Sequence, residues 1–195
     1  MKIQAPFWAE SKELKHLFCL LDDRVRFVGG CVRDTLLGAT PNDTDLATPL
    51  LPAEVKERLE PHFRIIPTGI EHGTLTVLIN GKDLKKAEIT TLRKDIATDG
   101  RHAVVAFSKD WKEDASRRDL TINALYADFQ GNVFDFFGGI DDLKAGIVRF
   151  IGDPSARIRE DYLRVLRFFR FYARYAKRPP DKETLKACRE GITCG

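Results

Sequence analysis

The sequence lacks the cysteine and histidine patterns of a cross-linked or zinc-bound protein. It has four cysteines, none of them in a C-x-x-C pair or beside a histidine at metal-ligand spacing: Cys19, Cys31, Cys188 and Cys194. A disulfide framework and a structural zinc site are therefore not expected, and reduced thiols are the expected state.

Long apolar runs are also missing. Nowhere do about 18 apolar residues follow one another, which excludes a membrane-spanning helix at the level of the sequence. Residues 1–17 mix charged with apolar side chains and show no continuous apolar core of a signal peptide. We therefore expect a cytoplasmic protein with no membrane partner.

Neither sign of charge dominates the chain. Of its 195 residues 31% are charged, and the formal net charge is only +3, so a polyanionic partner is permitted without being required. Hydrophobic residues make up 43%, which is enough to bury the core of one domain, or of one domain and the start of another.

The hydrophobic pattern predicts short helices and strands in the first half of the chain. Helices are expected at 9–22, from Cys31 to a closing Gly38, and at 53–60. Strands are expected at 25–30, 42–48, 74–79 and 84–92, the last two joined by an Asn80-Gly81 turn.

The second half begins with a polar, glycine-containing segment, 93–112, that we expect to be a mobile loop. The elements expected after it are a helix leading into a strand at 117–128, a hairpin at 131–139, and a long helix at 154–176 that Pro179-Pro180 ends. A further helical pattern over 181–192 stops at the chain end. The sequence is therefore interpreted as a fragment, with an unusual natural C-terminus as the alternative.

Two aspartates, Asp43 and Asp45, follow a predicted glycine turn. On a strand, side chains at i and i+2 project to the same side, and a divalent cation relieves the repulsion between two such carboxylates. An isolated D-x-D is more often a solvated turn. Here Gly29-Gly30 and Arg33 precede it, and glycine backbone and guanidinium both suit phosphate. This combination favours a joint metal and phosphate site.

A third acid, Glu88, is flanked by apolar residues on a predicted strand. It either completes a carboxylate triad beside the D-x-D strand or faces outward at an edge, and the sequence supports the two equally. On a predicted helix, Asp119 and Asn123 share a face, and with Arg118 they suit a ribose and its phosphates. An exposed helix start with ordinary surface arginines is the alternative, which chemistry alone favours.

The most informative segment is the predicted helix that contains Glu160 and Asp161. Its expected apolar face consists of Val165, Leu166, Phe169, Tyr172, Ala173 and Ala176. Its opposite face carries Arg164, Arg167, Arg170 and Arg174. With almost no acid between them, these arginines predict an anionic ligand rather than a salt-bridged surface. Asp161 and Arg164 together could read the edge of a base.

Four motifs, in this order, resemble those of the class II tRNA nucleotidyltransferase and bacterial poly(A) polymerase family. They are Gly29-Gly30-x-Val32-Arg33-Asp34 with Asp43-x-Asp45, Arg117-Arg118-Asp119 through Asn123-Ala124, Phe136-Phe137-Gly138-Gly139-x-Asp141-Asp142-Leu143, and Glu160-Asp161-x-x-Arg164. The match runs from about residue 25 to 176, and four motifs in register argue strongly against chance.

The resemblance implies an α+β fold: a nucleotidyltransferase head with a small mixed β-sheet flanked by helices over 1–150, then a helical neck, cut short, over 151–195. Asp43 and Asp45 would hold Mg²⁺, with Glu88 as a third catalytic candidate. The implied nucleotide-binding residues are Gly29, Gly30, Arg33, Arg118, Asp119, Asn123, Asp161, Arg164, Arg167 and Arg170. Among these, Asp161 and Arg164 would select the base.

The implied reaction is template-independent addition of CMP and AMP, from CTP and ATP, to the 3′ end of tRNA. It would use two metal ions, release pyrophosphate and need no histidine base. His16, His62 and His102 are therefore assigned structural or surface positions. The segment 93–112 would help to switch from C to A.

Two alternatives stay open. A poly(A) polymerase would use the same chemistry with ATP alone, although His72-Gly73-Thr74 resembles the CCA-adding branch more closely. A truncated, non-catalytic module that binds NTP or RNA is the second alternative. The presence of both Asp43 and Asp45 argues against it.

Overall fold

The computed structural model describes residues 1–69, 72–79, 86–99 and 102–194. The chain divides into two compact units, each of which is described by itself. The sheet unit comprises Met1–Arg93, Phe107–Trp111 and Tyr126–Phe134. The helical unit comprises Lys94–Ala106, Lys112–Leu125 and Asp135–Gly195.

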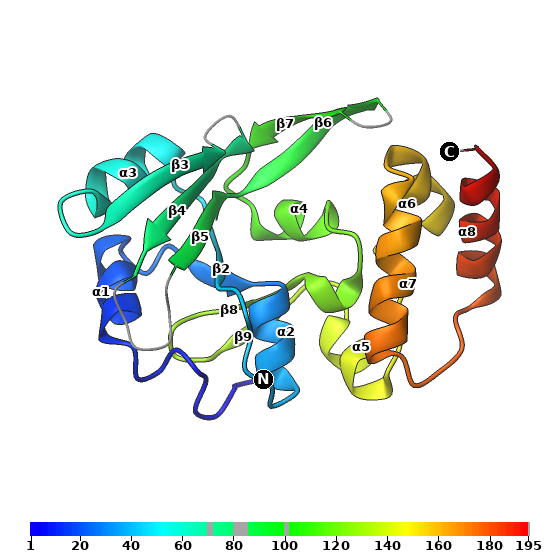
Figure 1. Ribbon diagram of the computed structural model, residues 1–195, viewed down its shortest axis with the longest axis horizontal. Coiled ribbons are helices and arrows are strands. Elements are labelled where there is room, and N and C mark those ends of the chain that lie inside the picture. The colour runs from blue at the N-terminus through cyan, green and yellow to red at the C-terminus, as the bar shows by residue number, and fades with distance from the viewer. Residues whose placement is uncertain (70–71, 80–85, 100–101, 195) are drawn as a thin grey trace. The chain divides into compact units, whose positions relative to one another are not determined.

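A seven-stranded mixed sheet forms the centre of the sheet unit (Figure 1). Its strands are β1 (Arg26–Val28), β2 (Asp45–Thr48), β3 (Arg64–Gly69), β4 (Thr74–Leu78), β5 (Lys86–Thr91), β8 (Leu125–Ala127) and β9 (Val133–Asp135), in the order β3-β4-β5-β2-β1-β8-β9. The β2–β5 pair is parallel, whereas β1–β2, β1–β8, β3–β4 and β4–β5 are antiparallel.

Three helices accompany this sheet: α1 (Lys12–Leu20), α2 (Gly30–Leu36) and α3 (Pro52–Leu59). Local chemistry sets two of their starts. The Ser11 hydroxyl accepts a hydrogen bond from the first turn of α1, at Leu14 N. Pro52 opens α3, where its missing N–H costs nothing. Helix α3 packs on β3 and β4, and α1 packs on α3 (Figure 1).

Stacked aromatic rings fill the core of the sheet unit. The ring of Phe27, from β1, lies 3.9 Å from that of Trp8 and 5.0 Å from that of Phe18. All three side chains are buried. Such large rings bury much apolar area, so they fix β1 against the N-terminal segment and α1.

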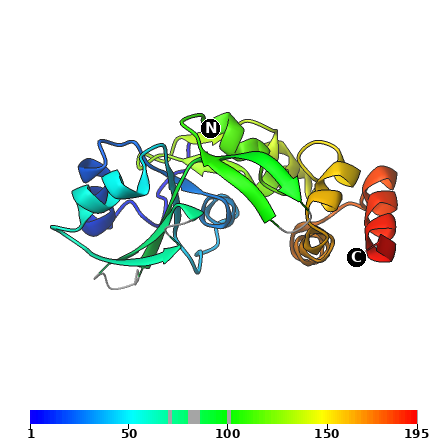
Figure 2. The ribbon, with the colours of Figure 1, turned by 90° about the horizontal axis from the view of Figure 1, so that it is seen from above.

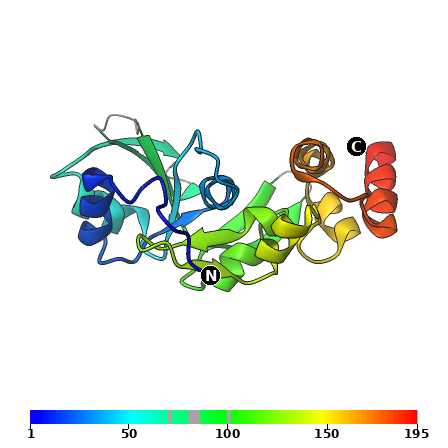
Figure 3. The ribbon, with the colours of Figure 1, turned by 90° about the horizontal axis from the view of Figure 1, so that it is seen from below.

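In its described residues, the helical unit contains five α-helices, a 3-10 turn and a two-stranded sheet. They are β6 (Arg93–Asp99), β7 (His102–Phe107), α4 (Trp111–Ser116), η2 (Thr121–Asn123), α5 (Gly139–Ala145), α6 (Pro154–Glu160), α7 (Leu163–Tyr175) and α8 (Lys182–Cys194). Strand β6 and helix α4 begin at residues of the sheet unit. Figures 2 and 3 show α6, α7 and α8 as neighbours.

A glycine brings two of these helices together. Helix α8 packs on α6, and a β-carbon at Gly191 would lie 2.5 Å from Ile158 Cγ2. On α7, Val165 and Phe168 are buried, and the Phe168 ring lies 5.4 Å from that of Phe150. None of the helices in the described part of the chain combines the length and apolar character that crossing a bilayer requires.

The predicted α+β class is confirmed: a mixed sheet with flanking helices is present. Most elements predicted in the first half of the chain exist within a few residues of their predicted bounds. The Asn80-Gly81 turn lies outside the described residues, although the strands on either side of it, β4 and β5, pair as the predicted hairpin. Strand β2 begins at Asp45, so Asp43 precedes it.

The prediction of a loop at 93–112 is wrong. Most of it forms β6, β7 and the start of α4. The run His102–Phe107 is rich in apolar and β-branched residues, which favour a strand over a loop. At the base of this ribbon, Ser108 N donates a hydrogen bond of 2.7 Å to Leu92 O and joins its two ends.

The prediction of a single helix over 154–176 is also wrong, because two helices, α6 and α7, cover this range. Asp161 lies between α6 and α7 with φ −160° and ψ 108°, and its carboxylate accepts a hydrogen bond of 3.0 Å from Leu163 N. A short acidic side chain that bonds to the nearby backbone competes with the helix at this point. The segment 117–120 is not helical either, because α4 ends at Ser116 and only η2 follows.

The predicted apolar face of α7 is only partly correct. Val165 is buried, but Leu166 is 68% and Phe169 is 41% exposed, whereas Phe168 is fully buried. The break at Asp161 makes α7 a separate helix. The side that it turns inward is therefore set by packing on Phe150, which the helical period alone does not reveal.

Candidate functional site

A glycine turn connects β1 to α2. Gly29 has φ 71° and ψ −122°, a backbone conformation that residues other than glycine rarely adopt. Arg33 N donates to Gly29 O at 3.0 Å and closes the turn. A β-carbon at Gly30 would meet only Arg33 Nη2, at 3.6 Å, so Gly30 leaves the backbone open on that side.

Arg33 is held close to this turn. Its guanidinium is nearly buried, and its Nε donates to Asp34 Oδ1 at 2.9 Å. The neighbouring carboxylate therefore orients the arginine before any phosphate arrives. A guanidinium has five N–H donors in a planar fork, so one bond to Asp34 is compatible with a further anion contact.

Cys31, which the sequence analysis did not select, ties the turn to the acidic strand. Its thiol donates to Val28 O at 3.3 Å and to Asp45 O at 3.5 Å. Burial raises the pKa of Cys31 to about 12, so the thiol stays neutral and acts as a small hydrogen-bonding wedge. Its place immediately after the two glycines is the only sequence signal for this role.

The acids of the sheet unit lie on neighbouring strands. Asp45 is in parallel register with Glu88, and Glu88 N donates to Thr44 O at 2.9 Å. Thr44 is buried while Asp43 and Asp45 are more exposed, and Asp43 precedes the first residue of β2. Glu88 is thus beside the D-x-D segment, as the first of its two interpretations requires.

Lys86 lies beside the acidic side chains. Its Nζ lies 2.9 Å from Glu88 Oε1. The hydrogen bond that it donates to Glu88 raises the pKa of Lys86, and the charges of Glu88, Asp43 and Asp45 raise it further. The negative charge of these acids therefore favours the protonated form of Lys86.

The carboxylate oxygens present here fit a Mg²⁺ ion whose remaining coordination positions are filled by water and substrate. The described residues contain no group of three or more acidic, histidine or cysteine side chains close enough to form a full metal cage. Mg²⁺ characteristically takes only one or two carboxylates and fills its other positions with water and substrate phosphate. The carboxylates of Asp43 and Asp45 are hard oxygen donors of the kind that such an ion takes.

In the helical unit, Asp119 is an anchor. It is 6% exposed, and its Oδ2 accepts from Arg167 Nε at 2.8 Å and from Nη2 at 2.7 Å. Its Oδ1 accepts from Asn123 Nδ2 at 3.3 Å and from Leu120 N at 2.8 Å. Burial opposes ionisation, but the charge and hydrogen bonds of Arg167 outweigh it and lower the pKa of Asp119 below its usual range.

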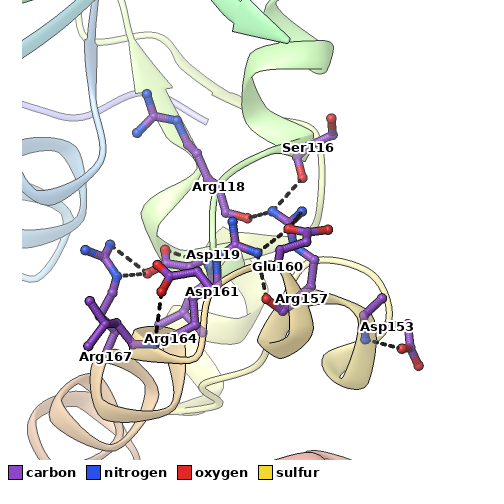
Figure 4. A network of polar contacts seen from close by, with 12 residues as sticks. Ser116, Arg118, Asp119, Asp153, Arg157, Glu160, Asp161, Arg164 and Arg167 are labelled. Atoms are coloured by element: carbon purple, nitrogen blue, oxygen red, sulfur yellow. Dashed lines mark hydrogen bonds and ion pairs between the residues drawn. The ribbon is translucent and has the colours of Figure 1, made fainter. Parts of the chain in front are cut away.

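The corner between α6 and α7 is closed by a second arginine network (Figure 4). Arg164 Nη1 donates to Arg157 O at 2.8 Å and also to the Glu160 carboxylate. Arg157, which the sequence analysis missed, donates to Glu160 Oε2 at 2.8 Å, to Arg118 O at 2.6 Å and to Ser116 O at 3.2 Å. Buried Arg157 thus fixes both Arg118 and the corner.

The prediction that the arginine row on α7 lacks acids is wrong for its first half. Arg164 pairs with Glu160 from α6, and Arg167 pairs with Asp119 from 48 residues earlier. A partner so distant in sequence cannot be found by helical spacing. In the second half, Arg170 and Arg174 lie over the rings of Phe171 and Tyr175, with centroid distances of 5.0 and 5.1 Å.

The third motif is structural. Asp142 Oδ2 accepts from Thr121 Oγ1 at 2.6 Å and from Arg149 Nε at 2.7 Å, which secures η2. A β-carbon at Gly139 would lie 2.2 Å from Thr121 O, so α5 can approach η2 only with glycine at this position. The second and third motifs are therefore one packed assembly.

The His72-Gly73 segment is held in the sheet unit. Arg93 Nη1 donates to His72 O at 3.1 Å, and Gly73, with φ 79°, lies against the Phe107 ring. A β-carbon at Gly73 would approach Phe107 Cε1 to 2.7 Å. The two ends of the β6–β7 ribbon, at Arg93 and Phe107, are thus attached to this turn.

Comparison with known proteins shows which family and which proteins this chain is similar to. Residues 25–149 match the family described as the poly A polymerase head domain. The chain is 46% identical over 199 residues to the Homo sapiens protein named CCA tRNA nucleotidyltransferase 1, mitochondrial, covering 97% of this chain and 45% of that protein. It is 45% identical over 147 residues to the CCA-adding enzyme of Ligilactobacillus salivarius (strain UCC118), covering 74% and 35%.

Solved structures of CCA-adding enzymes are also similar to this chain. The Bacillus stearothermophilus CCA-adding enzyme in complex with CTP superposes with a TM-score of 0.78 at 34% identity, over 94% of this chain and 43% of that one. The Thermotoga maritima CCA-adding enzyme complexed with tRNA-CCA gives 0.72 at 26% identity, over 94% and 43%. The chain thus spans less than half the length of these relatives.

Proposed function

This chain belongs to the poly(A) polymerase head-domain family, which includes its CCA-adding relatives, and from that membership we propose that it is the nucleotidyl-transferring part of a CCA-adding tRNA nucleotidyltransferase. The proposed substrates are CTP, ATP and the 3′ end of tRNA. One observation carries the proposal: Asp45 lies in register with Glu88 and is tied through Cys31 to the Gly29-Gly30 turn. Metal ligands and phosphate ligands then belong to one small substructure.

Asp43 and Asp45 are the proposed ligands of Mg²⁺. When bound, the ion would lower the pKa of the RNA 3′-hydroxyl and neutralise charge on the leaving pyrophosphate. The chain itself holds the triphosphate in place: the Gly29-Gly30 backbone admits it closely, and Arg33, oriented by Asp34, binds its oxygens. Most of the rate enhancement is expected from this positioning and charge neutralisation.

Glu88 is the proposed third acid of the site. Its carboxylate accepts from Lys86 Nζ, so in the absence of metal the Lys86 ammonium supplies positive charge there. The Glu88 carboxylate would add negative charge near the RNA 3′-hydroxyl and so favour the binding of a cation there. No histidine is required in this scheme.

The helical unit supplies the proposed base selection. Arg164 Nη1 donates hydrogen bonds to Arg157 O and to the Glu160 carboxylate. These two contacts fix the orientation of the guanidinium. Asp161, beside it, carries acceptor oxygens. A fixed donor fork and an acceptor can distinguish the hydrogen-bonding edges of C and A from those of G and U.

The remaining predicted residues have supporting parts in this proposal. Arg118 would contact the sugar or phosphate, while Asp119 and Asn123 hold their segment in place. Arg167 acts through Asp119 as a positioning residue. Arg170, together with Arg174, extends the positive surface of α7.

The principal alternative is a poly(A) polymerase, and one experiment separates the two. The chain is incubated with each labelled NTP and a tRNA that ends at the discriminator base, and the product is then sequenced. We expect ordered addition of C, C and A. Incorporation of AMP alone would establish the alternative, and the absence of any incorporation would favour a non-catalytic binding module.

The human relative and the Thermotoga maritima enzyme are each more than twice as long as this chain. We expect the chain to bind NTP and Mg²⁺. The division into a head over 1–150 and a helical neck over 151–195 stays a prediction. So does the cytoplasmic location, since one relative is named as mitochondrial.

A further inference from the structure

A hollow of the sheet unit lies at the opposite end of the strand order from β9. It is a groove with a volume of about 600 Å³ between the start of α1 and the connection from α3 to β3. Its walls are Lys12, Glu13 and His16 on one side and His62, Phe63 and Arg64 on the other. A volume of this size is within the range of small-molecule sites.

The groove is lined by other residues than the carboxylates described above. Its strand residues, Arg64 and Leu78, lie on β3 and β4, whereas Glu88 lies on β5 and Asp45 on β2. In the strand order, β5 therefore lies between the groove strands and the strand of Asp45. None of the groove residues belongs to the four family motifs.

Three aromatic rings gather in the groove. The imidazoles of His16 and His62 lie edge to face with centroids 5.0 Å apart, and the Phe63 ring lies 5.8 Å from that of His16. Flat rings at the mouth of an open groove provide a surface on which a nucleic-acid base can stack.

Two cations flank the rings in the described lining. Lys12 lies four residues before His16 on α1 and thus shares a face with it, while Arg64 opens β3 on the other wall. Among the described lining residues the one acid is Glu13, which accepts a hydrogen bond of 3.3 Å from the Ser11 hydroxyl. Within this described lining, the two cations Lys12 and Arg64 therefore outnumber the single carboxylate.

We propose that this groove is a second nucleotide-binding site, which takes a nucleoside 5′-phosphate unit with its base on the His16, His62 and Phe63 rings and its phosphate between Lys12 and Arg64. The unit is either a free mononucleotide or one nucleotide of a single-stranded RNA. The site stands independently of the proposed catalytic activity, because it uses none of the same residues.

Histidine NMR tests the proposal directly on the whole chain without Mg²⁺. AMP is titrated while the ring Cε1 proton signals of His16 and His62 are followed. We expect saturable shifts of both signals, and the same shifts in the Arg33→Ala variant, whose catalytic phosphate site is impaired. Loss of the shifts in Arg33→Ala would assign them to the catalytic site and overturn the proposal.

Variants define the groove. Lys12→Ala and Arg64→Ala should each weaken AMP binding about tenfold, because each removes a charged hydrogen-bond donor from the phosphate. Lys15→Ala, an exposed charge change on the same helix outside the lining, is the matched control and should leave binding unchanged. Glu13→Gln should tighten it about threefold by removing the one acid. Equal weakening by Lys15→Ala would show unspecific attraction and overturn the proposal.

Two further probes separate the ligand parts and sources. Inorganic phosphate alone should bind much more weakly than AMP, and equal affinity would overturn the role of the rings. A short cytidine dinucleotide is compared with AMP: tighter binding of the dinucleotide identifies an RNA strand as the source, and tighter binding of AMP identifies a free nucleotide. The absence of shifts with either probe at millimolar concentration would reject the site.

Discussion

The two units hold their proposed functional groups in different ways. In the sheet unit, Asp45 and Glu88 are placed by strand register, and their side chains are partly exposed. In the helical unit, Asp119 and Arg164 are placed by partly buried ion pairs that also hold the fold together. A carboxylate placed by the backbone can be removed with little structural cost, whereas a charge within a buried network cannot. Activity and stability should therefore separate in the first unit and move together in the second.

The largest effect is expected at the acidic pair. Asp45→Ala should lower nucleotide transfer by about a thousandfold or more, because a lost metal site removes several kcal/mol of transition-state stabilisation. The thermal midpoint should stay within a few degrees of the original. Incorporation of labelled CMP and thermal denaturation measure the two. Substantial transfer by this variant would reject the assignment of Asp45 to the metal.

The matching change in the helical unit should alter stability. Asp119→Ala leaves Arg167 and Asn123 without their shared acceptor, and we expect a loss of about 1–3 kcal/mol in the free energy of unfolding. Urea denaturation measures it. Asp119→Asn, which keeps the shape, should lose less. An unchanged unfolding midpoint in Asp119→Ala would contradict the role of this residue as an anchor.

The same pair predicts a pH dependence. The pKa of Asp119 is lowered in the folded state, so its contribution is present above its unfolded pKa of about 4 and is lost as the pH falls through the lower, folded value. Between about pH 5 and pH 2, the original chain should therefore lose more stability than Asp119→Asn. Parallel loss in the two proteins would show that Asp119 does not contribute to the acid sensitivity.

A smaller effect is expected on base choice. Arg164→Ala should reduce the preference for CTP over UTP by about tenfold, since a fixed hydrogen-bond donor is worth about 1–2 kcal/mol in discrimination. Arg164→Lys keeps the charge but loses the planar fork, so it should rescue stability more than selectivity. Incorporation assays with paired NTPs give the ratio. If both variants kept full selectivity, base reading would belong to other residues.

The smallest effect is expected at Lys86. Its pair with Glu88 is exposed, and such pairs contribute little, so Lys86→Ala should leave the fold unchanged. Because the lysine competes with a cation for the same acids, Mn²⁺ affinity should rise by about two- to fivefold. Weaker Mn²⁺ binding in this variant would contradict the competition.

Prediction from the sequence succeeded where local rules control the outcome. The glycine turn after β1, the strand carrying Asp45 and the β4–β5 hairpin follow from periodicity and turn chemistry, and the structure has all three. The adjacency of Glu88 and Asp45 could be stated only as one of two interpretations, because a parallel pairing between strands about 40 residues apart leaves no local signal.

Prediction failed where distant side chains decide. The pairing of Arg167 cannot be predicted, because Asp119 is far away in the sequence, and the helix break at Asp161 depends on one side-chain hydrogen bond to the backbone. Arg157 was overlooked for the same reason: its partners, Ser116 and Arg118, carry no pattern that connects them to it. The segment 93–112 was misjudged because its polar residues and glycine hid the strand-forming run at 102–107.

The central claim is that Asp43 and Asp45 together hold the divalent ion beside the glycine turn. Mn²⁺ binding, followed by electron paramagnetic resonance in the presence of CTP, tests it without depending on turnover. The original chain should bind the ion, and the double variant Asp43→Asn with Asp45→Asn should lose that binding while its thermal midpoint stays the same. Equal Mn²⁺ binding by the folded double variant would contradict the claim.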